Sequence, residues 1–301
     1  MFKKFSISNQ VFFFCYNAVR ACKTQVILMT LFVGCQVSAN PLQDFHTAAL
    51  KSATQELLSA TDPGARRIAI EKEIKALNSL GRSVEALDRL NVSDASVPAD
   101  RRDAELRAKV LLALDRCDEA VALLTDKIKI KESITQQTVG AVFEPGGYII
   151  AAVEELISHA YCSVRLGKFD DAVISLSRVI DPFDPATRQY TVLWYTALRA
   201  VGAKPNARME KEVQFVSRKP SPHTISRDAI ERLLSLSGAR DALGKLRLEP
   251  ADAQDALAEL SFFIAFVDGS VAVKKDALRE LNALAPYGSA EWALAKLLFQ
   301  P

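Results

Sequence analysis

The chain has 301 residues, of which 49% are hydrophobic and 25% charged, a composition typical of a globular protein with a substantial core. Its formal net charge is +2, but residues 1–39 carry four basic side chains and no acidic one. Without that segment, the 38 lysines and arginines fall to 34 against 36 acidic residues, a net charge of −2. A nearly neutral chain has no electrostatic attraction for nucleic acid, so we expect no nucleic-acid partner.

Residues 1–39 have the pattern of an export signal. A basic leader precedes the apolar run Val26–Val33, and Val37-Ser38-Ala39 forms a cleavage pattern before Asn40. The run is too short for an ordinary membrane span. We therefore predict that 1–39 is a signal peptide and that the mature chain is periplasmic or secreted.

An alternative fate follows from Phe32-Val33-Gly34-Cys35, which is similar to a bacterial lipoprotein box with phenylalanine where leucine is usual. Lipidation at Cys35 would make the protein a membrane-anchored lipoprotein. This anchor is the one membrane contact that we expect.

Residues 40–62 are predicted to form an N-terminal helix and a linker, because apolar residues from Leu42 to Leu58 keep helical spacing. Asp62-Pro63 then has the pattern of an N-cap followed by proline in the first helical turn.

Residues 63–286 contain a repeat of helical hairpins. One alanine recurs at separations of 34, 52, 35, 35 and 35 residues, and leucine or valine stands one and four positions after five of the six alanines. A turn residue precedes most of these helices. The alanines are Ala86, Ala120, Ala172, Ala207, Ala242 and Ala277, and the turn residues are Gly81, Asp115, Gly167, Gly202 and Gly238.

The longest separation contains an insertion. Residues 132–148 include a β-prone stretch and the turn Pro145-Gly146-Gly147, so we predict a loop that contacts a partner. At the other end of the chain, residues 287–301 are predicted to be a C-terminal capping helix with Ser289 as its N-cap.

The best-defined hairpin runs from Ser158 to Pro182. Apolar residues of its second helix, from Phe169 to Ile180, form one stripe, and Asp170, Asp171, Ser175 and Arg178 are expected to point elsewhere. Its Gly167, Phe169 and Ala172 resemble the second half of a tetratricopeptide repeat, and Asp115 to Ala120 match that pattern in part, with Cys117 where an aromatic residue is usual.

The resemblance implies an all-α fold, a right-handed α-solenoid of about six hairpins whose first helices line a concave groove. Such grooves bind proteins or peptides. Carried over hairpin by hairpin, the resemblance assigns the groove to Lys75, Glu105, Lys109, Tyr161, Arg165, Thr196, Arg199, Arg227 and Glu231.

Glu155, His159 and Cys162 are spaced so that a helix would place them on one face. A metal or nucleophile site could use such a face, but a position inside the packed hairpin is the stronger interpretation. Phe262, Phe263, Phe266, Trp194 and Tyr195 are expected in the core. Cys117 and Cys162 are either buried thiols or, after export, a disulfide.

No catalytic, cofactor or metal motif of known spacing is present. The first functional hypothesis is therefore a non-enzymatic adaptor in the bacterial envelope that binds proteins or peptides. The alternative is an enzyme, or a binder of a small ligand or metal, in which the 132–148 segment covers Glu155 and His159.

Overall fold

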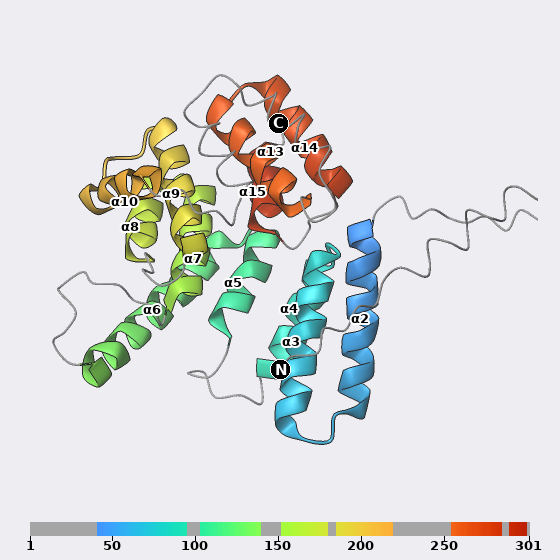
Figure 1. Ribbon diagram of the computed structural model, residues 1–301. Coiled ribbons are helices and arrows are strands. Elements are labelled where there is room, and N and C mark those ends of the chain that lie inside the picture. Colours follow the sequence, from blue (N-terminus) through green and yellow to red (C-terminus); the bar gives the residue numbers. More distant parts are fainter. Residues whose placement is uncertain are drawn as a thin grey trace, which may run out of the picture. The chain divides into compact units, whose positions relative to one another are not determined.

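The computed structural model describes residues 41–94, 103–139, 152–179, 185–218, 254–284 and 289–299. These ranges contain twelve α-helices and no strand, so the all-α class is confirmed for them (Figure 1). Within the same ranges, no helix has both the length and the hydrophobicity that crossing a bilayer requires.

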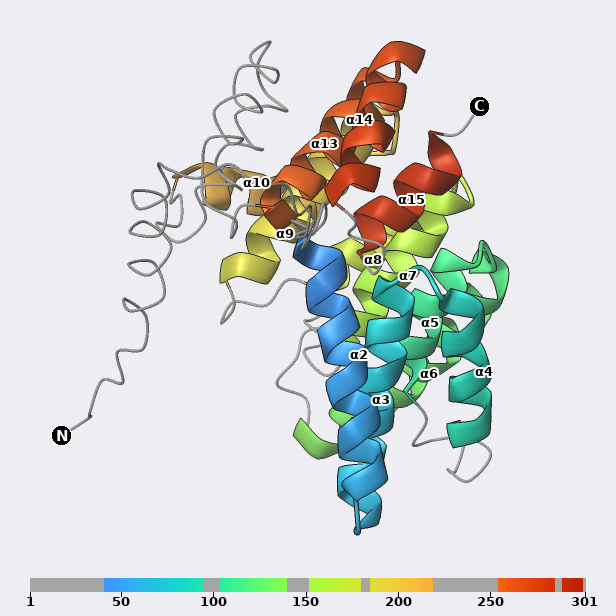
Figure 2. The same cartoon turned by 90° about the vertical axis from the view of Figure 1, so that its right-hand side faces the viewer.

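Most of the helices follow one another as antiparallel neighbours joined by short connections. Each described helix from α2 to α10 packs on the next, and α13, α14 and α15 do the same (Figures 1 and 2). The helices are α2 (Pro41–Ser59), α3 (Pro63–Ser79), α4 (Ser83–Asp94), α5 (Ala104–Ala113), α6 (Cys117–Val139), α7 (Val153–Arg165), α8 (Phe169–Arg178), α9 (Pro185–Ala200), α10 (Ala207–Arg218), α13 (Gln254–Asp268), α14 (Val271–Leu284) and α15 (Ala290–Leu298).

Four helix pairs, α3/α4, α5/α6, α7/α8 and α9/α10, are closed by the same turn. The residues predicted at the turns adopt left-handed backbone, with φ of 72° at Gly81, 59° at Asp115, 70° at Gly167 and 104° at Gly202. In each turn the next amide donates to the carbonyl five residues earlier, over 2.8 to 2.9 Å. This is the Schellman arrangement, which satisfies carbonyls that the end of a helix leaves unpaired. The donor and acceptor pairs are Arg82 and Leu77, Arg116 and Leu111, Lys168 and Ser163, and Ala203 and Leu198.

The recurring alanine of the second helix lies in the core in the first three pairs. Ala86, Ala120 and Ala172 are completely buried, as are Leu124 and Leu176 four residues after the last two. A methyl group is all that the close approach of the paired helices admits at these positions.

Ala207 does not follow this rule. It is exposed and is the first residue of α10, because Lys204 and Pro205 lengthen the turn after Gly202. In α10 the completely buried residue is instead Met209. The alanine spacing was therefore the wrong guide to the core in the fourth pair. Ala242 lies outside the described residues.

Two other local predictions need correction. Helix α6 continues to Val139, so the first part of the segment predicted as a loop from 132 to 148 is helical; residues 140–148 lie outside the described residues. Ser175 was expected to point away from the packed face of α8, but it is buried next to His159.

The C-terminal helices pack on the first helices of the pairs. Helix α13 contacts α9, and α15 contacts α5 and α7 as well as its neighbours α13 and α14. The predicted N-caps are confirmed: Asp62 accepts from the amide of Ala65 at 2.9 Å, and Ser289 from that of Trp292 at 3.1 Å.

An aromatic cluster joins α9 to α13. The Trp194 ring lies 5.4 Å from that of Phe262 and 4.9 Å from that of Phe263, and all three side chains are buried. Phe266 stacks on Phe262 at 5.6 Å. These residues were predicted to be core, and the structure confirms it.

Ala172 and Ala207 offer a matched test of the packing, because they hold the same place in the sequence repeat but differ in burial. Ala172→Leu should lower the free energy of unfolding by about 1 to 3 kcal/mol, since the added atoms overpack the α7/α8 pair. Ala207→Leu should change it by less than about 0.5 kcal/mol. Urea denaturation followed by circular dichroism measures both, and equal losses would contradict the assignment.

Candidate functional site

The residues predicted to line a groove lie on the first helix of each pair, α3, α5, α7 and α9. Lys75 on α3 and Arg199 on α9 are exposed. Glu105 and Lys109 on α5, Arg165 on α7 and Thr196 on α9 are half-buried, and Tyr161 on α7 is buried. Arg227 and Glu231 lie outside the described residues.

The charged residues of α5 and α7 are paired with groups of the same chain. Lys109 forms an ion pair with Glu105 one helical turn away, and its ammonium lies 3.9 Å from the carboxylate of Glu154. Arg165 donates two hydrogen bonds to Asp115, over 2.7 and 2.9 Å. These hydrogen bonds lower the pKa of Asp115. The contact links the turn of the α5/α6 pair to the first helix of the next pair.

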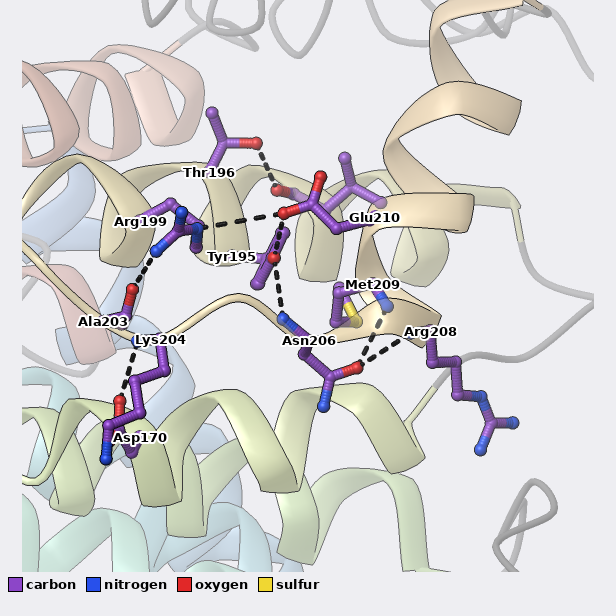
Figure 3. Close-up of polar contacts among 11 residues, drawn as sticks. Asp170, Tyr195, Thr196, Arg199, Ala203, Lys204, Asn206, Arg208, Met209 and Glu210 are labelled. Atoms are coloured by element: carbon purple, nitrogen blue, oxygen red, sulfur yellow. Dashed lines mark hydrogen bonds and ion pairs between the residues drawn. The ribbon is translucent and has the colours of Figure 1, made fainter.

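Arg199 belongs to a polar network at the turn between α9 and α10 (Figure 3). Its guanidinium donates to the carbonyl of Ala203 and lies 3.8 Å from the carboxylate of Glu210. The hydroxyl of Tyr195 donates to Glu210 and accepts from the amide of Asn206 at 3.1 Å. Burial is the main cause that raises the pKa of Tyr195, so this hydroxyl stays a donor.

Helix α8, which lies below this turn in Figure 3, also forms hydrogen bonds with it. Asp170, in the first turn of α8, accepts from the backbone amide of Lys204 at 2.8 Å and pairs with its ammonium at 3.0 Å. The backbone hydrogen bond is the largest cause of the lowered pKa of Asp170. Asn206 caps α10 by accepting from the amides of Arg208 and Met209 at 3.1 and 3.2 Å. The turn that follows Arg199 is therefore held by hydrogen bonds from both α8 and α10.

A buried polar chain connects α7, α9 and α15. The hydroxyls of Tyr161 and Tyr190 lie 2.6 Å apart, and the hydroxyl of Tyr190 donates to the carboxylate of Glu291 in the first turn of α15. Burial and the charge of Glu291 raise the pKa of both tyrosines well above the usual value. Tyr161 thus belongs to the core and not to an exposed groove.

No sequence pattern indicates this row of buried polar side chains. Tyr190 and Glu291 are 101 residues apart, and the acidic first turn of α15 is an ordinary helix-start pattern. Only the packing of α15 on α7 brings its carboxylate to the two hydroxyls.

Glu155, His159 and Cys162 do lie on one helix, but each has a different neighbour. Glu155 is buried and pairs with the ammonium of Lys131 on α6 at 2.5 Å. Nδ1 of His159 lies 2.9 Å from Oγ of Ser175 and 3.3 Å from that of Ser163, and burial lowers the pKa of the imidazole. Among the described residues, no three His, Cys, Asp or Glu side chains are grouped so that they could hold a metal.

Comparison of the chain with protein-family models, curated proteins and solved structures gives no match. The resemblance to tetratricopeptide repeats therefore depends on the residues of this chain alone, and the groove assignment stays a prediction.

The pair of Asp115 and Arg165 predicts a pH dependence. Asp115→Asn keeps a residue that tolerates left-handed backbone but removes the charge, and should lower the free energy of unfolding by up to about 1 kcal/mol at pH 7. Because folding lowers the pKa of Asp115, this stabilisation is complete above the unfolded pKa of about 3.9 and is lost as the pH falls through the folded pKa. Urea denaturation between pH 7 and 3 measures the difference.

Asp88→Asn, which removes an exposed carboxylate from α4, serves as the control for the loss of one negative charge. A stability difference between native protein and Asp115→Asn that persists unchanged to pH 3 would contradict the pairing.

Proposed function

We propose that this chain is a non-enzymatic adaptor that binds protein or peptide partners on the first helices of a tetratricopeptide-like array. The observation that carries the proposal is the turn shared by four helix pairs, with a left-handed residue at the same place and the same hydrogen bonds. Repetition of one hairpin extends a surface from pair to pair, which is how helical-repeat proteins bind partners. A right-handed solenoid is part of this proposal.

Contacts within the chain leave only part of the predicted groove exposed for a partner. Helix α15 packs on α5 and α7, and the charges of Lys109 and Arg165 are already paired within the chain. Lys75 on α3 and Arg199 on α9 are the predicted groove residues that are exposed among those described, and the guanidinium of Arg199 also lies 3.8 Å from the carboxylate of Glu210. Both are cations, so we expect a partner that presents carboxylates to them.

The place of action is proposed from the N-terminal sequence. A cleavable signal at 1–39 would release the adaptor into the periplasm or medium, whereas lipidation at Cys35 would hold it at a membrane. Both fates leave residues 40–301 to bind partners in the cell envelope.

The alternative hypothesis of a ligand or metal site at Glu155 and His159 has less support. The carboxylate of Glu155 is paired with Lys131, and the imidazole of His159 faces two serine hydroxyls. Both interactions join α7 to a neighbouring helix or stabilise α7 itself, as packing contacts do.

Photo-crosslinking from single positions tests the adaptor proposal. A benzophenone amino acid at Lys75 or at Arg199 should capture the same partner in cells that make the protein naturally. Ile174 on α8 is the matched control, because it is also exposed but lies on a second helix. Crosslinks from Ile174 that equal those from Lys75 and Arg199, or no crosslink from either of these two, would contradict the proposed surface.

A further inference from the structure

Cys117 and Cys162 are buried at the contact between two helix pairs. Cys117 is the first residue of α6, Cys162 lies in the last turn of α7, and these two helices pack on each other. The exposed fractions of the two residues are 2% and 1%. Both thiols are free in the structure.

Two features indicate that the thiols lie close together. The interaction with the side chain of Cys117 is the largest cause of the raised pKa of Cys162, ahead of burial. On the surface beside them, Arg165 holds Asp115 with two hydrogen bonds of 2.7 and 2.9 Å. Since Asp115 is two residues from Cys117 and Arg165 three from Cys162, the ion pair joins the two chain segments that carry the cysteines.

Cys117 and Cys162 are the two cysteines outside the predicted signal peptide. The chain has five, and Cys15, Cys22 and Cys35 all lie in residues 1–39. Removal of a signal peptide would leave Cys117 and Cys162 as an even pair, without a competing thiol. An exported protein meets oxidising conditions, in which adjacent cysteines become disulfides.

We propose that Cys117 and Cys162 form an intramolecular disulfide that ties the α5/α6 pair to the α7/α8 pair. The thiolate of one cysteine attacks a disulfide oxidant and releases one thiol from it. The thiolate of the second cysteine then attacks this mixed disulfide and releases the other thiol. The cysteines lose two electrons and two protons in all, and the oxidant is reduced to two thiols.

The disulfide would form while the chain folds and not after folding is complete. In the folded chain the thiols are covered and the raised pKa of Cys162 keeps its reactive thiolate scarce. During folding the same residues are accessible while α6 and α7 come together. The bond would then close a loop of about 45 residues in the unfolded chain, which raises the melting temperature by roughly 5 to 15 °C.

The test is refolding of the full chain from denaturant in a buffer of reduced and oxidised glutathione. Digestion without reductant, followed by mass spectrometry, should identify the Cys117 peptide linked to the Cys162 peptide as the main disulfide species. Reductant should then lower the melting temperature of the native sequence by roughly 5 to 15 °C. The Cys117→Ala/Cys162→Ala variant is the control, and its melting temperature should not respond to reductant.

Refolded protein in which both thiols react with a maleimide, or in which they pair with Cys15, Cys22 or Cys35, would overturn the proposal. An unchanged melting temperature on reduction of the native sequence would also do so. The test does not use partner binding or export, so its outcome is independent of the proposed adaptor function.

Discussion

The left-handed residue that closes each of four helix pairs is the constraint on which the rest of the structure depends. It ends the first helix, reverses the chain and lets the next amide bond to a carbonyl of the last turn. In the first three pairs the second helix begins two residues after this residue. Glycine is the usual residue for this backbone because it has no Cβ to clash. Asp115 adopts it without that advantage, and its carboxylate forms a bidentate ion pair with Arg165 on the next pair.

The position of the second helix then decides which side chains are buried. Where the helix starts soon after the turn, alanine is completely buried and the helices approach closely. Contacts between pairs add to this packing: Asp170 holds Lys204, and Arg178 on α8 pairs with Glu132 on α6. The C-terminal helices complete the core through the cluster around Trp194 and the chain from Tyr161 to Glu291. A buried polar network of this kind favours one packing of the core, because any other packing would leave a buried polar group without a hydrogen-bond partner.

Local features of the fold were predictable from the sequence, and long-range ones were not. The turns, the caps Asp62 and Ser289, and the burial of Phe262 and Trp194 follow from residue type and spacing within one or two helical turns. Ala207 was misplaced because Lys204 and Pro205 lengthen the turn while the repeat length stays the same. Burial of Tyr161 depends on Tyr190 and Glu291, which neighbouring sequence does not reveal.

The same limit applies to the candidate site. The resemblance to tetratricopeptide repeats assigns Lys75, Arg165 and Arg199 to first helices, but it does not show which cations are already paired. The ion pair of Arg165 and the contact of α15 with α5 and α7 come from segments far apart in the chain. The exposed part of the predicted groove could therefore be recognised only from the structure.

Hydrogen exchange measured by NMR tests the central claim most directly, at the amides of Arg82, Arg116, Lys168 and Ala203. Each donates the hydrogen bond that closes one helix pair. If one turn is repeated four times, all four amides exchange much more slowly than in an unfolded chain. Exchange at the unfolded rate at any of these amides would contradict the account.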